Sequence, residues 1–135
     1  MSSIILARAA FADSVDLKLK IKAEGEEVVL HAPEAQDTVM QTIAIAPGGH
    51  TGWHSHPGPV VVLVKSGELT LYDGDDPGCT GRSFSAGQAF VDRGQGHVHL
   101  ARNLSGQTTE LAVTYFDVPP GAPFRIDAPD PGTCN

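Results

Sequence analysis

The stretch GGHTGWHSHPGPVVVLVKSG, residues 48–67, contains three of the six histidines of the chain beside an apolar run. Side chains two positions apart on a β-strand point to the same side, so His54 and His56 share a face if they lie on a strand. Glycines and prolines bound the stretch on both sides, as is typical of the turns between short strands. The pattern predicts a β-rich region in which at least two imidazoles face one way.

Runs of strand length recur along the rest of the chain, separated by clusters of Gly, Pro and Asp, and no helical periodicity exceeds two turns. Many short strands at regular spacing predict an all-β sandwich or barrel, and jelly rolls of this kind can hold a ligand inside. Residues 66–67 (Ser-Gly) favour a tight hairpin turn between two of these strands. The expected strands are 16–22, 27–31, 37–46, 60–64, 68–72, 88–91, 97–103 and 110–117.

Length and charge limit the classes of protein. The 135 residues fit a single domain, residues 1–135, with an irregular proline-rich tail over 118–135. The net charge of −7 argues against a nucleic-acid partner, because phosphate contact requires clustered Lys and Arg. No apolar run is long enough to span a membrane, and the N-terminus lacks the basic region of a signal peptide. A cytoplasmic location and no membrane contact are therefore expected.

The two cysteines, Cys79 and Cys134, lie in polar turn-like sequence away from the histidines. Distant cysteines in a cytosolic chain are more often free thiols than a bridge, so free thiols are expected. A disulfide between them is the alternative.

A second histidine pair, His97 and His99, occurs in GHVHLARN, residues 96–103. Because they are also two positions apart, these two side chains share a face of their strand, an argument from strand parity. If both pairs face the interior, three or four imidazoles meet, and neutral imidazole binds Fe, Mn, Cu, Ni and Zn. The sequence therefore predicts one divalent transition metal, although a single histidine in a strand is more often a surface or core polar residue.

These residues resemble the two motifs of the cupin family. The first cupin motif, G(x)5HxH(x)3–4E(x)6G, aligns with Gly48 to Gly67, and the second, G(x)5PxG(x)2H(x)3N, aligns with Gly87 to Asn103. The resemblance implies a double-stranded β-helix, or jelly-roll, barrel with motif regions 48–67 and 87–103.

The chain departs from both motifs. Val60 replaces the metal-binding glutamate of the first motif, and the second motif has one extra residue and Gly94 in place of its proline. The ligands that the resemblance implies are therefore His54, His56 and His99. His97 is not a ligand of the family, and parity alone adds it, either as a fourth ligand or as a side chain beside the pocket.

A three-histidine centre leaves the +2 charge of a metal uncompensated and leaves coordination positions open for an oxygen-rich small molecule. Within the cupins such a site resembles those of dioxygenases, so a mononuclear oxidoreductase is expected. The alternatives are a metal-dependent isomerase, cyclase or lyase, and a non-enzymatic module that binds a metal or small ligand. No acid–base or nucleophilic residue is assigned. Homodimers are common among cupin-like barrels, so the resemblance also allows a homodimer.

The remaining pocket residues follow from parity and proximity. Val60 and Val62 are expected to form a dry wall beside the metal, and Trp53 to face away from the ligands or sit at the mouth. Gln41 and Arg102 are the nearest polar candidates for contact with a substrate.

Overall fold

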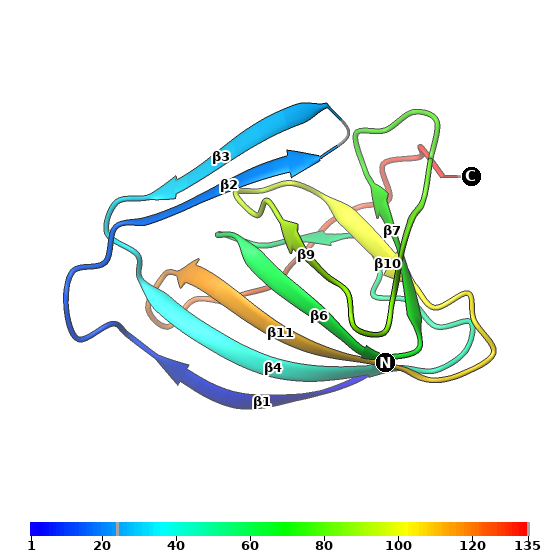
Figure 1. The fold of residues 1–135 in the computed structure, drawn as a ribbon, viewed down its shortest axis with the longest axis horizontal. Helices are drawn as coiled ribbons and strands as arrows, with labels where there is room; N and C mark the ends of the chain where they lie inside the picture. The colour runs from blue at the N-terminus through cyan, green and yellow to red at the C-terminus, as the bar shows by residue number, and fades with distance from the viewer. Residues whose placement is uncertain (24, 135) are drawn as a thin grey trace.

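The computed structural model describes residues 1–23 and 25–134, which form β-strands and connecting turns and contain no helix (Figure 1). Every strand expected from the sequence is present, with ends that differ by at most two residues. The strands are β1 (Ser2–Ala9), β2 (Leu17–Ala23), β3 (Glu26–Ala32), β4 (Asp37–Ile45), β5 (His54–Ser55), β6 (Val60–Ser66), β7 (Glu68–Asp73), β8 (Arg82–Ser85), β9 (Ala89–Asp92), β10 (His99–Arg102), β11 (Thr109–Val118) and β12 (Ile126–Asp127).

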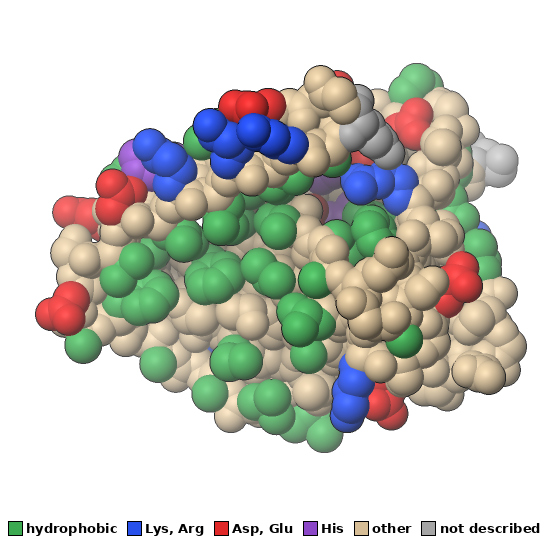
Figure 2. Space-filling view, in the orientation of Figure 1, with side chains coloured by type: hydrophobic (Ala, Val, Ile, Leu, Met, Phe, Trp, Pro, Cys, Tyr) green, Lys and Arg blue, Asp and Glu red, His purple; other side chains and the backbone are tan. Residues whose placement is uncertain are grey.

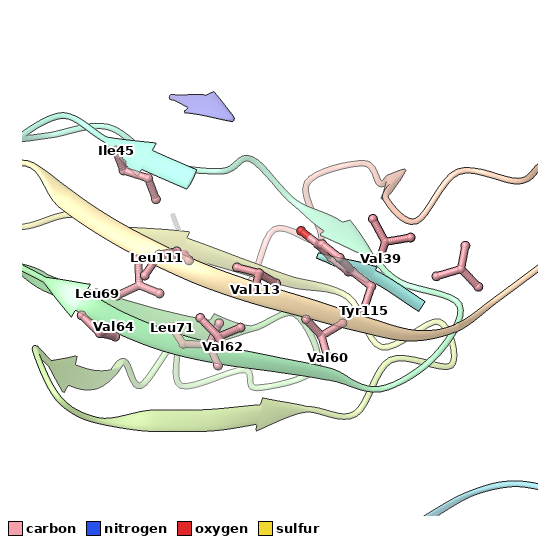
Figure 3. Close-up of a cluster of buried hydrophobic side chains, with 12 residues drawn as sticks. Val39, Ile45, Val60, Val62, Val64, Leu69, Leu71, Leu111, Val113 and Tyr115 are labelled. Carbon is pink, nitrogen blue, oxygen red and sulfur yellow. The ribbon is translucent and has the colours of Figure 1, made fainter. Parts of the chain in front are cut away.

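Two five-stranded antiparallel sheets make up the barrel, with strand orders β1-β4-β11-β6-β9 and β12-β5-β10-β7-β8. The inward side chains of β6 and β11 meet those of β7 in a buried apolar cluster that includes Val62, Leu71 and Val113 (Figure 3). Burial of these branched side chains holds the two sheets together, at roughly 25 cal/mol per Å² of apolar surface removed from water.

Strands β2 and β3 form a separate antiparallel hairpin that lies apart from both sheets in Figure 1. Its apolar residues Leu17, Leu19 and Ile21 are half-buried, and the intervening lysines are exposed. The strict alternation of β2 therefore has the physical origin expected from the sequence, with one face packed and the other in solvent.

The hairpin predicted at Ser66-Gly67 is wrong. Strands β6 and β7 follow one another closely, but they belong to different sheets and do not pair. Gly67 has a φ of +80°, and a Cβ there would lie 2.5 Å from Oγ1 of Thr109. That hydroxyl donates to the Glu68 carbonyl and accepts from the Glu68 N–H, so it fastens the corner at which the chain changes sheets. A two-residue connection suits a corner as well as a hairpin, so its length does not distinguish them.

The strands that the sequence did not indicate are β1, β5, β8 and β12. All eight side chains of β1 are exposed, so no alternation marks it. Strand β8 is mostly polar, and β5 and β12 have two residues each. Pairing with a neighbour defines these strands, because their own sequence pattern is weak.

Cys79 and Cys134 form a disulfide, so the expectation of free thiols is wrong. The bridge joins the loop between β7 and β8 to the end of the C-terminal tail, with 55 residues of sequence between the two cysteines. The tail returns past β5 before it reaches Cys134, and this path brings the two thiols together.

Replacing both cysteines by serine should destabilise the fold by about 2–4 kcal/mol, because the bridge restricts the unfolded chain. Chemical denaturation of the double variant under non-reducing conditions measures this change. Wild-type protein treated with a reductant is the matched control and should show the same loss. A free energy of unfolding equal to that of untreated wild type would contradict the bridge.

Candidate metal centre

Three histidines meet between the two sheets. His54 on β5 lies directly opposite His99 on β10 in the antiparallel register, and His56 follows two residues after His54. The ring centroids are 4.3 Å apart for His54 and His99, 4.8 Å for His54 and His56, and 5.3 Å for His56 and His99. All three residues are buried, and one nitrogen of each lies within 4.8 Å of the others. These distances suit a single shared ion.

Backbone carbonyls orient the three rings. Nδ1 of His54 lies 2.8 Å from the Gly52 carbonyl oxygen, and Nδ1 of His56 lies 2.6 Å from that of Phe124. Nδ1 of His99 lies 3.3 Å from the carbonyl oxygen of His97. If each Nδ1–H donates to its carbonyl, each Nε2 keeps its lone pair, which is the tautomer that binds metals through Nε2. The donor set therefore fits a transition metal such as Fe, Mn, Cu, Ni or Zn.

Burial also keeps the imidazoles of His54 and His56 neutral. Desolvation, with smaller repulsion from His99, lowers the pKa of His54 from 6.5 to about 3. Desolvation likewise lowers the pKa of His56 to about 4, although its bond to the Phe124 carbonyl opposes the shift. Neutral imidazole is the metal-binding form, so both side chains are ready to act as ligands near neutral pH.

His97 lies apart from the three-histidine group. Strand β10 begins at His99, so the parity argument does not extend to His97, which lies in the preceding turn. Its Nε2 is 3.7 Å from Asp73 and 3.6 Å from Asp75, and its Nδ1 is 3.6 Å from Asp92. Facing these carboxylates, Asp92 above all, His97 has a raised pKa. These contacts favour the alternative in which His97 lies beside the site and is not a ligand.

Asp92, at the end of β9, is a site residue that the sequence analysis missed. Its carboxylate is buried, and Oδ1 lies 3.5 Å from Nδ1 of His99. Burial alone would raise the pKa of this carboxyl, but the neighbouring His97, His99 and His56 together hold it below its usual value. A weak signal was present in the sequence, because Asp92 is two residues from the apolar Phe90 and therefore shares its face.

Two connected spaces adjoin the histidines. The inner cavity, of ≈ 50 Å³, has mostly apolar walls that include Val60 and Val62. An outer space of ≈ 340 Å³ is lined by Gln41 and Arg125, among others. His54, His56 and Tyr115 border both spaces. The outer space is large enough for a small organic molecule, and the inner one for about one or two waters.

Tyr115 and Gln41 form a buried polar pair at the junction of the two spaces. The Tyr115 hydroxyl donates to Oε1 of Gln41 at 2.6 Å, and the Tyr115 ring lies 5.1 Å from that of His56. Burial raises the pKa of the Tyr115 phenol, so the hydroxyl stays protonated. The amide NH₂ of Gln41 is a further donor on the wall of the outer space.

Arg102 does not reach the pocket, in contrast to the expectation from the sequence. It lies at the outer end of β10, where its guanidinium stacks over Tyr72 at 5.8 Å. Arg125, in the C-terminal tail, takes the place expected for a cationic side chain: it lines the outer space and donates to the Thr51 carbonyl at 2.6 Å. Trp53 is half-buried and lines neither space, so the structure does not place it among the pocket residues, where the sequence analysis had included it. No local pattern marked Arg125, because only the fold of the tail brings it to the mouth.

No family model and no curated protein matches the sequence. Among solved structures, a protein with a double-stranded β-helix domain from Klebsiella pneumoniae has a TM-score of 0.53 at 19% identity, covering 84% of this chain and 85% of that one. The chain has a double-stranded β-helix fold. This result confirms the jelly-roll prediction, which is the fold that the resemblance of the two motifs implied.

Two further structures similar to this chain come from enzymes. An oxalate oxidase has a TM-score of 0.55 at 26% identity, covering 67% of this chain and 46% of that chain. The polyketide cyclase RemF from Streptomyces resistomycificus has a TM-score of 0.54 at 23% identity, covering 70% of this chain and 64% of that one. The chain thus spans about half the length of the oxalate oxidase chain, and the likeness to RemF establishes the fold alone.

The metal-free protein should lose stability on acidification. The folded-state pKa values of His54 and His56 lie below 6.5, so the unfolded chain binds more protons between pH 6.5 and about 3. The free energy of unfolding should therefore fall as the pH falls through that window. Urea denaturation of chelator-treated protein at a series of pH values measures this slope. The double variant His54→Gln/His56→Gln should show a flatter profile, and an equally steep one would contradict the assignment.

Proposed function

We propose that His54, His56 and His99 hold one divalent transition metal and that the chain is an oxidoreductase acting on a small oxygen-rich acid. The observation that carries this proposal is the convergence of three buried, carbonyl-oriented imidazoles at the junction of an apolar cavity and a wider mouth. When bound, such a metal supplies a Lewis acid that orients a bidentate oxygen ligand and promotes redox chemistry with O₂.

The similar oxalate oxidase structures support the substrate class. One of them, at 28% identity and a TM-score of 0.53, contains the substrate analogue glycolate. Oxalate and glycolate are both small acids with two adjacent oxygen-bearing carbons, and the space of ≈ 340 Å³ accommodates molecules of that size. We therefore assign small 2-oxo and 2-hydroxy acids, dicarboxylates and related enolates as the substrate class.

The chain's own residues suit such an anion. The guanidinium of Arg125 carries five N–H donors, and it uses Nη2 to bind the Thr51 carbonyl and Nε to bind the Asp127 carboxylate. Its other donors, which bind no other residue described in the structure, can bind a carboxylate in the outer space that Gln41 also lines. On the opposite side, Val60 and Val62 exclude water and so strengthen electrostatic interactions within the site.

Two other functions predict different behaviour. A metal-dependent isomerase, cyclase or lyase would turn over substrate without consuming oxygen. A binding module would take up the metal and a small ligand without turnover. Oxygen uptake with oxalate, glycolate, diketones, thiols and phenols separates all three functions. Metal binding without oxygen consumption on any of these compounds would overturn the oxidoreductase proposal.

Replacing His99 by Ala should abolish metal binding, whereas His97→Ala should only weaken it, because His97 faces carboxylates instead of the other two rings. Metal content by mass spectrometry and titration calorimetry on chelator-stripped protein measure both effects. His31→Ala is the matched control, since His31 is exposed and bonds to Asp16 far from the site. Equal losses in both variants would make His97 a ligand, and intact binding in His99→Ala would refute the three-histidine centre.

Replacing Arg125 by Gln should raise KM for an anionic substrate by about 10- to 100-fold with a smaller change in kcat, because a charged hydrogen bond to the substrate is lost. Steady-state oxygen uptake measures both constants. Asp127→Asn is the control, since it breaks the same ion pair with Arg125 but leaves the guanidinium at the mouth. Identical changes of KM and kcat in both variants would show that Arg125 only holds the C-terminal tail in place and does not bind the substrate.

We also propose a second copy of this chain as the partner that covers the outer face of the first sheet. Ile4, Thr42, Ala112 and Leu63 follow one another across β1, β4, β11 and β6 in register. Ile4 and Leu63 are exposed, and Figure 2 shows hydrophobic side chains gathered over this face. Strand β1 also leaves one edge of the sheet open, and such apolar edges pair readily with another chain.

The disulfide between Cys79 and Cys134 is relevant to the cellular compartment in which the protein works. The described residues contain no helix long and apolar enough to cross a membrane. Cytosolic thiols are kept reduced, so the bond between Cys79 and Cys134 argues against the cytoplasmic location expected from the sequence. We propose that the protein works in an oxidising compartment.

A further inference from the structure

Asp92 is a buried carboxylate whose hydrogen bonding is incomplete. Its side chain is 4% exposed, and within residues 1–23 and 25–134 its Oδ2 atom has no hydrogen-bond partner. Oδ1 lies 3.5 Å from Nδ1 of His99 and 3.6 Å from Nδ1 of His97, at ion-pair distance. A buried charge with incomplete hydrogen bonding costs stability. Its presence therefore points to a role in the site.

The strand register connects Asp92 with the missing glutamate. Asp92 on β9 pairs directly with Val60 on β6, and Val60 stands where the cupin motif has its glutamate. Directly opposed residues have Cβ atoms about 4.5–5.5 Å apart. Both side chains line the same inner cavity as the three histidines. A carboxylate is thus present beside the expected position, one strand away.

We propose that Asp92 supplies, from β9, the negative charge that the glutamate of the motif would supply from β6. It acts as a positioning residue through His99, whose Nδ1–H it approaches together with the His97 carbonyl. A carboxylate next to a ligating imidazole fixes the ring and increases its basicity toward the metal. It also offsets part of the +2 charge that three neutral imidazoles leave uncompensated. The inference rests on the proposed three-histidine metal site.

The competing role for Asp92 is to balance His97. Nε2 of His97 already faces two other carboxylates, Asp73 and Asp75. His97 therefore keeps acidic neighbours without Asp92, whereas the nearest carboxylate to the His99 ring is that of Asp92. The two roles predict different consequences for metal binding.

The test is the affinity of chelator-stripped Asp92→Asn for Co²⁺, followed by calorimetry and by the visible absorption of the bound ion. The variant should bind Co²⁺ about 10- to 100-fold more weakly than wild type and with an altered spectrum. Its metal-free form should be at least as stable to heat as wild type, because the substitution removes an incompletely paired buried charge. Asp73→Asn is the control: it removes a carboxylate from His97 only and should leave the affinity unchanged.

A second variant tests the charge itself. Val60→Glu in the Asp92→Asn background returns a carboxylate to the opposed position, and it should recover part of the lost affinity. A folded double variant with no recovery would overturn the proposal. Wild-type affinity in Asp92→Asn would also overturn it and leave the three-histidine site intact. Absence of Co²⁺ binding in wild type would instead overturn the proposed function and this inference with it.

Discussion

The candidate centre depends on one backbone pairing, the antiparallel alignment of β5 with β10 that sets His54 opposite His99. Strand β5 has only two residues, so it has little stability of its own. β10 on one side and β12 on the other hold it in the sheet. The same segment of tail that supplies β12 presents the Phe124 carbonyl to His56 and Arg125 to the mouth. The C-terminal tail is therefore part of the site.

Burial and charge oppose each other at this centre. Removing His54 and His56 from water lowers their pKa values and keeps them neutral, which makes them good ligands but leaves a cation without compensation. The surroundings offer negative charge on one side, at Asp92, and positive charge on the other, at Arg125. Under the proposed function, this arrangement would favour an anion that enters from the mouth and reaches the metal from the side of Arg125. The apolar wall at Val60 and Val62 keeps water from screening these charges.

Strand existence was predictable because alternation and apolar runs report burial directly, as β2 and β6 show. Which strands pair with one another in a sheet was not predictable from the sequence. Ser66-Gly67 suits a hairpin as well as a corner, and only the packing of two sheets decides between them. The parity argument agrees with the meeting of His54 and His56, although His56 lies just beyond the end of β5, and it does not hold for His97, which lies before β10. The disulfide was missed for a related reason, since the tail must cross the barrel before Cys134 meets Cys79.

The sequence by itself determined the class of fold and the three histidines, since both follow from short-range spacing: period-two alternation and the HxH motif. It also revealed the missing glutamate at Val60. Only the tertiary structure decided what surrounds those histidines. Asp92 enters through the register of β9 against β6, and Arg125 through the path of the tail. Both contacts join residues that are far apart in the chain. The local sequence around a strand does not indicate which distant strand lies beside it.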